Sequence, residues 1–89
     1  MTIDETVLWF NTQMEYNKSD SDSKNAFLCG VTSDIDGLRS AGSRLIVCYT
    51  KCNTHETARL LLTKLNDNGF EIENSVSGSE DIFVYMSRK

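Results

Sequence analysis

The thiols and the single imidazole are the side chains of this sequence best suited to metal binding or nucleophilic chemistry. The pattern Cys48-x3-Cys52-x2-His55, joined by Cys29 from a neighbouring strand, could supply four zinc ligands. However, Cys48 falls inside a predicted strand and His55 in the first turn of a predicted helix, so the spacing is poor. A Cys–His nucleophile pair has the same weakness and no evident orienting acid. We therefore expect free thiols, no metal and no cofactor.

The carboxylates do not form a recognisable catalytic set either. Asp34 and Asp36 are typical of the start of a helix, and Glu80 and Asp81 are typical of a turn. Acid–base catalysis would need a carboxylate in an apolar cleft, which the sequence does not indicate. The segment Ser77–Ser79 is too short for a phosphate-binding loop. We accordingly assign no catalytic residue.

Composition favours a protein partner over nucleic acid or a membrane. The 89 residues predict one domain, spanning 1–89, and nine basic against thirteen acidic side chains give a net charge of -4. Nucleic-acid binding draws most of its affinity from Lys and Arg, so this balance disfavours it. No apolar run is long enough to span a bilayer. The acidic start of the chain does not resemble an export signal, so we expect a cytoplasmic protein with reduced thiols.

Apolar runs mark the expected strands. Strand formers predict that residues 5–10 pair antiparallel with 26–32, although the preceding Thr2–Glu5 could instead cap a short helix. The polar segment between them, at about 14–25, is expected to be a solvated loop. The run at 44–50 is apolar on both faces, which predicts a central, covered strand. Further strands are expected at 70–74 and 82–87.

Two helices are expected between these strands. The first is capped by Ser33, carries Ile35, Leu38 and Ala41 on one face, and ends at Gly42. The second covers 54–68 after an Asn53 cap and ends at Asn68-Gly69; its buried stripe consists of Ala58, Leu61, Leu62 and Leu65. The order predicts an α+β fold, with a small antiparallel or mixed sheet of three to five strands and two helices packed on it.

The segment FLCGVTSDIDGLRSAG, followed by LIVCYT and by HETARLLLTKLNDNGF, resembles a GIY-YIG nuclease domain. The resemblance covers roughly residues 5–70, and its firmest part is Gly30 to Ile35. It implies a GIY-YIG-like arrangement of strands and helices. The positions that align with the family's motif are Leu28, Gly30, Thr32, Asp34 and Arg39.

The catalytic positions of that family are lost in this sequence. Leu28 stands where the second strand's tyrosine is expected, and Leu38 stands in place of the arginine, with Arg39 one position away. One step rotates a side chain by about 100° around a helix. Leu61, Leu62 and Thr63 occupy the region of the metal-binding glutamate. Hard cations need oxygen ligands, so the resemblance implies a fold retained without catalysis.

We therefore expect a non-catalytic interaction module with a degenerate GIY-YIG-like fold, which binds a protein partner and regulates or inhibits it. Many phage-encoded effectors have this size, and such a protein would act in the host cytoplasm. The candidate contact residues are Trp9, Tyr16, Asp20, Asp22 and Tyr85. A homodimer through an edge strand is a further expectation left open.

Two alternatives remain open at this point. The first is a divergent metal-dependent endonuclease that uses Arg39, Tyr49 and a carboxylate such as Glu56. The second is a non-catalytic nucleic-acid binder, whose affinity would fall steeply with salt.

Overall fold

The chain forms three α-helices and a four-stranded mixed sheet in a computed structural model that describes residues 2–19, 23–42 and 45–89. The sheet order is β2-β4-β1-β3; β1 pairs antiparallel with β4 and parallel with β3, and β4 pairs antiparallel with β2. The elements in chain order are α1 (Ile3–Asn17), the 3-10 turn η1 (Lys24–Ala26), β1 (Phe27–Thr32), α2 (Ile35–Ser40), β2 (Leu45–Lys51), α3 (His55–Asp67), β3 (Glu71–Ile72) and β4 (Phe83–Arg88). The predicted α+β class is confirmed.

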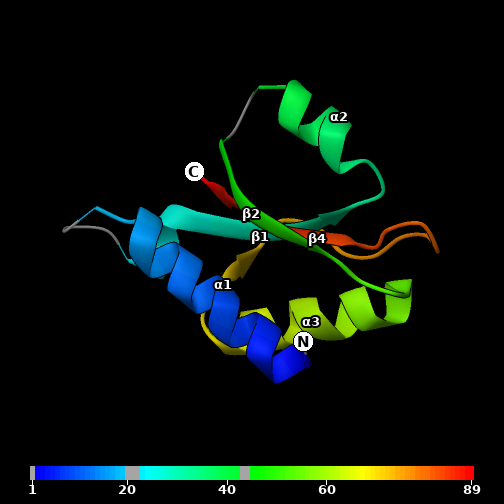
Figure 1. Ribbon diagram of the computed structural model, residues 1–89, viewed down its shortest axis with the longest axis horizontal. Helices are drawn as coiled ribbons and strands as arrows, with labels where there is room; N and C mark the ends of the chain where they lie inside the picture. Colours follow the sequence, from blue (N-terminus) through cyan, green and yellow to red (C-terminus); the bar gives the residue numbers. More distant parts are fainter. Residues whose placement is uncertain (1, 20–22, 43–44) are drawn as a thin grey trace.

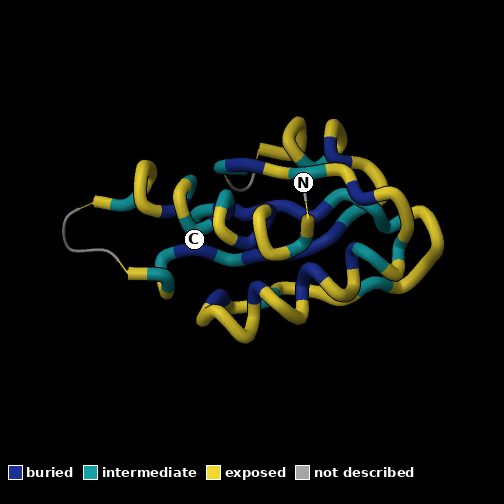
Figure 2. Tube along the Cα trace, turned by 60° about the horizontal axis from the view of Figure 1, so that its bottom comes forward, coloured by how far each residue is buried: buried dark blue, intermediate teal, exposed yellow. Residues whose placement is uncertain are grey.

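The sheet separates two layers of helices. Figure 1 shows α1 and α3 on one side of the sheet and the short α2 on the other. The core lies on the α1–α3 side, where both helices turn their buried positions inward, as Figure 2 shows. The core residues with the largest fully buried side chains are Phe10, Phe27, Phe70, Leu61, Leu65, Met86 and Val84.

Helix α1 overturns the prediction of a strand at residues 5–10. A capping box starts the helix: the Glu5 amide donates to Thr2 Oγ1 at 3.1 Å, and the Thr2 amide donates to Glu5 Oε1 at 3.0 Å. Its buried residues Val7, Phe10 and Met14 follow helical spacing and face the sheet. The weaker alternative, a cap at the start of the chain, was therefore the right one. The helix also takes up the first four residues of the predicted polar loop.

Helix α3 matches its predicted stripe closely. Ala58, Leu61, Leu62 and Leu65 are all buried against the sheet. The cap differs by one residue from the prediction, because Thr54 rather than Asn53 accepts from the Thr57 amide. The helix ends at Asp67 with Asn68 as its cap, and Gly69 follows with a φ of 95°, in the left-handed region that favours glycine.

The short helix α2 is displaced by one residue at its start. Asp34, not Ser33, caps it by accepting a hydrogen bond at Oδ1 from the Gly37 amide, at 2.9 Å. Ile35 is buried, Leu38 is half-buried and Ala41 is exposed, so the predicted stripe holds only for its first two positions. Gly42 follows the helix with a φ of 70°, as expected for a terminating glycine.

Strand β2 lies at an edge of the sheet, so the prediction that it would be central is wrong. Strand β4 occupies the central position next to it. The prediction failed because β2 has neighbours on both faces: α1 contacts it on the core side, and Arg39 of α2 lies over the Tyr49 ring on the other. The cover on the α2 side is incomplete, since Tyr49 is 38% exposed and Lys51 is exposed, and the outer edge has no neighbouring strand. Within the described residues, no helix is long and apolar enough to cross a membrane.

Candidate functional site

The residues that carry the family resemblance gather around the end of β1, on the face of the sheet turned toward α2. Strand alternation places Leu28, Gly30 and Thr32 on one face, opposite the core residues Phe27, Cys29 and Val31. Thr32 Oγ1 then accepts a hydrogen bond from the Asp34 amide at 3.1 Å, which orders the turn into α2. The side chains of Thr32 and Asp34 thus stabilise this turn through hydrogen bonds to nearby backbone amides.

Gly30 is required by a tyrosine on the neighbouring strand. Tyr85 lies opposite Gly30 in the β1–β4 pairing, and a Cβ at Gly30 would lie only 2.4 Å from the Tyr85 hydroxyl oxygen. That hydroxyl donates to Glu73 Oε2 at 2.5 Å. The glycine thus leaves room for an aromatic ring that crosses β1 to reach a carboxylate. Tyr85 is only 2% exposed, so it is a packing residue here and is unavailable as a partner contact.

Asn74 completes this cluster by ending the pairing between β1 and β3. Its Oδ1 accepts a hydrogen bond from the Val31 amide at 2.7 Å, in the position where a strand carbonyl would otherwise lie. The preceding backbone contact runs from the Glu73 amide to the Cys29 carbonyl, at 2.7 Å. The sequence alone does not indicate that Glu73 and Asn74 lie beside Gly30, since their positions depend on strand register.

The three residues of the nuclease alternative do not meet. Arg39 and Tyr49 come together on the α2 side, with the guanidinium carbon 5.8 Å from the ring centroid. Glu56 is on α3, which packs against the opposite face of the sheet. The leucines at the lost family positions are divided in the same way: Leu28 and Leu38 are half-buried on the α2 side, whereas Leu61 is buried in the core. A shared active site at these positions is therefore absent from the described residues.

The cysteines are separated within the core. Cys29 and Cys48 both pair with Met86, from opposite sides of β4, so about 10 Å separates their Cα atoms. A disulfide requires no more than about 7 Å. Burial raises the pKa of Cys48 to about 12 and also raises the pKa values of Cys29 and Cys52. Among the described side chains, no three His, Cys, Asp or Glu residues are grouped as a metal site would need.

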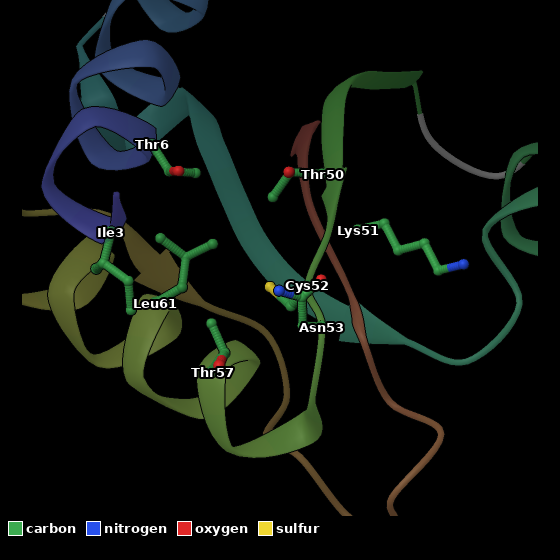
Figure 3. A pocket seen from close by; sticks show the side chains of 8 residues that line it. All are labelled: Ile3, Thr6, Thr50, Lys51, Cys52, Asn53, Thr57 and Leu61. Atoms are coloured by element: carbon green, nitrogen blue, oxygen red, sulfur yellow. The ribbon is translucent and has the colours of Figure 1, made fainter. Parts of the chain in front are cut away.

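A small cavity lies where α1, the end of β2 and the start of α3 meet. Figure 3 shows its lining, in which the Cys52 sulfur points toward the interior while Lys51 extends away from the other side chains. The cavity has a volume of about 210 Å³, below the roughly 300 Å³ at which ligand sites usually begin. Its remaining polar groups are hydroxyls of Thr6, Thr50 and Thr57 and the amide of Asn53. None of these is an acid or base suited to catalysis.

The outer edge of β2 is the most accessible feature that combines apolar and charged groups. The Cys52 amide donates to the Ile82 carbonyl at 2.7 Å, so alternation directs the backbone groups of Tyr49 and Lys51 away from β4. A hollow of about 290 Å³ runs along this edge between Trp9 and Arg39. We call this the β2 edge surface; it consists of Trp9, Gln13, Arg39 and Leu45–Lys51.

Exposure on the β2 edge surface is high for such large side chains. Leu45 is 65% exposed and Tyr49 is 38% exposed, and Trp9 is half-buried beside them on α1. Two cations lie over aromatic rings there, since Lys51 Nζ is 5.9 Å from the Phe83 ring centroid and Arg39 covers Tyr49. The surface is therefore locally basic on a chain whose net charge is -4.

The remaining contact candidates fall elsewhere. Tyr16 is 81% exposed near the end of α1, and it is not part of the β2 edge surface. Asp20 and Asp22 lie outside the described residues. Trp9 is among the residues predicted to contact a partner, whereas Leu45 and the free backbone edge are not, because the predicted strand lies in the centre of the sheet.

Comparisons with protein-family models, with curated proteins and with solved structures found no match for this chain.

Proposed function

We propose that this protein is a non-catalytic interaction module that binds a protein partner through the β2 edge surface and regulates or inhibits that partner. The observation that carries the proposal is a seven-residue edge strand whose outward backbone groups are flanked by Trp9, Leu45 and Tyr49. Extended peptides add to such edges through main-chain hydrogen bonds, while adjoining side chains supply selectivity. The lack of a grouped set of acids, bases or metal ligands among the described residues supports a binding role.

Charge supports an acidic segment as the occupant of this surface. Arg39 and Lys51 flank the exposed part of β2 on its α2 side. A partner strand that carries carboxylates would be steered toward them, whereas the acidic remainder of the chain would discourage other orientations. We retain the GIY-YIG-like ancestry, and an origin as a phage effector acting in the host cytoplasm, as parts of this proposal.

The test is a quantitative pull-down from a lysate of the source cell, or of the host cell if the source is a phage. The variant Leu45→Asp/Tyr49→Asp places two charges on the β2 edge surface. Its matched control, Tyr16→Asp/Leu60→Asp, changes two exposed apolar residues elsewhere, which are 81% and 50% exposed.

The expected result is a partner captured by the wild type and by the control, with capture by the edge variant reduced at least tenfold. All proteins must first show the same circular dichroism and a cooperative unfolding transition. Failure to capture any partner at micromolar bait, or equal capture by the edge variant, would exclude this surface as the binding site.

A further inference from the structure

The opposite edge of the sheet carries a second groove, between α3 and the chain that follows it. Its volume is about 490 Å³, within the range of roughly 300–1,000 Å³ typical of ligand sites. The helix contributes Arg59, Leu62, Thr63 and Asn66, which recur at helical spacing along one face. The facing wall consists of Glu71, Ile72, Asn74, Ser75 and Val76.

The floor of this groove is apolar and its wall is an open strand edge. Leu62 is 5% exposed, and Ile72 and Val76 pack partly buried against the core. The Glu73 amide donates to the Cys29 carbonyl, so alternation directs the N–H and C=O of Ile72 away from β1 and toward the groove. Within the described residues, the Ile72 N–H donates no hydrogen bond and the Ile72 carbonyl accepts none. An added strand would satisfy both.

The charges in the groove favour an acidic occupant. Lys89 Nζ forms a close ion pair with Glu71 Oε2, which neutralises the carboxylate at one end. Arg59 is exposed, and its guanidinium has no hydrogen-bond or ion-pair partner among the described side chains. The Arg59 guanidinium is therefore an unpaired cation on the α3 wall of the groove, beside its apolar floor. A guanidinium offers a planar fork that matches a carboxylate.

We propose that this groove binds an extended segment of a partner protein, which adds to the edge of β3 and presents an acidic side chain to Arg59. An apolar side chain of the segment, two residues from the acidic one, would face the same wall and pack on Leu62 and Val76. Side chains on one face of a strand repeat every second residue, at about 6.6 Å. This site is independent of the β2 edge surface, because β2 and β3 are the two opposite edges of the sheet.

The test begins with selection from a displayed library of random heptapeptides against the full chain. The expected consensus has an acidic residue with an apolar residue two positions away. A fluorescein-labelled synthetic peptide of that consensus is then titrated by fluorescence anisotropy against the wild type, Arg59→Gln and Lys64→Gln. Lys64 is a charge-matched control, since it is exposed on α3 and does not line the groove.

We expect Arg59→Gln to weaken binding at least tenfold and Lys64→Gln to change it less than twofold. N-methylation of alternate peptide amides should abolish binding, because it removes the strand hydrogen bonds. In amide chemical-shift mapping, the signals that move should belong to residues 59–66 and 71–76.

Several outcomes would overturn the proposal: no enriched peptide, a consensus without an acidic residue, or equal effects of the two substitutions. Shifts confined to residues 45–51 would place the peptide on the β2 edge surface, which would support the proposed function and refute the groove. Self-association that Arg59→Gln abolishes would identify a second copy as the occupant and would also refute it.

Discussion

Substitution of Gly30 by alanine tests the packing between β1 and β4 directly. The added Cβ would lie 2.4 Å from the Tyr85 hydroxyl oxygen, 2.6 Å from Tyr85 Cζ and 2.9 Å from Asn74 Oδ1. Neither neighbour can move without loss, since the Tyr85 hydroxyl is bonded to Glu73 and Asn74 Oδ1 is bonded to the Val31 amide. The β1–β4 register must therefore distort, or Tyr85 must leave its buried position.

The expected cost follows from these contacts. Overpacking of this kind costs about 1–3 kcal/mol, and loss of one hydrogen bond adds about 0.5–1.5 kcal/mol. Reduced freedom of the unfolded chain returns about 0.4–1 kcal/mol. We expect the free energy of unfolding of Gly30→Ala to fall by about 2 kcal/mol, the middle of the range of roughly 0.5–4 kcal/mol that these terms allow. The midpoint of thermal unfolding should fall by roughly 10 °C or more in a domain of this size.

The assay is urea unfolding followed by the fluorescence of Trp9, the only tryptophan. Gly78→Ala is the matched control, because a Cβ there meets no atom within 4 Å, and we expect its stability to lie within about 0.5 kcal/mol of the wild type. A Tyr85→Val background removes the two closest contacts and leaves only the 2.9 Å contact with Asn74 Oδ1. The Gly30→Ala penalty should therefore shrink there by about 1 kcal/mol or more. If Gly30→Ala unfolds like the control, or keeps its full penalty beside Tyr85→Val, this account of Gly30 is incorrect.

Three further predictions concern the core, the thiols and catalysis. Leu65→Ala should lower the free energy of unfolding by about 2–5 kcal/mol, because Leu65 is fully buried. Leu60 is half exposed, so Leu60→Ala should lower it by less than about 0.5 kcal/mol. Equal effects of the two substitutions in urea unfolding would contradict the assignment of the buried face of α3. Burial raises the pKa of Cys48 to about 12, while an unfolded thiol ionises near pH 8.5, so only the unfolded state loses its proton between these values. The stability that this thiol contributes should therefore be constant below about pH 8 and should decline at higher pH, by up to about 1.4 kcal/mol per pH unit. Cys48→Ala should decline less steeply, and an unchanged slope would show that Cys48 does not titrate on unfolding. In a plasmid-nicking assay with Mg²⁺ or Mn²⁺ we expect no cleavage; cleavage that Arg39→Ala abolishes would restore the nuclease alternative.

Local patterns were sufficient to predict the elements whose signals agree with one another. The stripe of α3, its glycine terminus and the apolar run of β1 each satisfied several rules at once. Helix α1 was misread because ETVLWF combines strand formers with a spacing that becomes helical only when Met14 is included. Met14 is the first residue of the predicted polar loop, so the helical spacing of Val7, Phe10 and Met14 was not recognised.

The candidate sites depended on information that the sequence does not contain locally. The pairing of Gly30 with Tyr85 requires the register of two strands separated by most of the chain. The position of β2 at an edge is set by the insertion of β4, and an apolar run can have the same composition at the edge of a sheet as at its centre. The groove beside β3 likewise depends on where the chain returns after Gly69. Only Trp9, which is half-buried on α1, and the motif around Gly30 could be identified from the sequence.

The central place of β4 has a consequence for how the chain folds. β4 follows every other helix and strand in the sequence, yet it lies between β1 and β2 and pairs with both. Until its residues arrive, β1 and β2 share no ladder, and only the β1–β3 pairing and the helices can form. Such non-local closure slows folding and leaves apolar strand edges open in the meantime. During synthesis, the four-stranded sheet therefore cannot be completed until the stretch from Phe83 to Arg88 has been added.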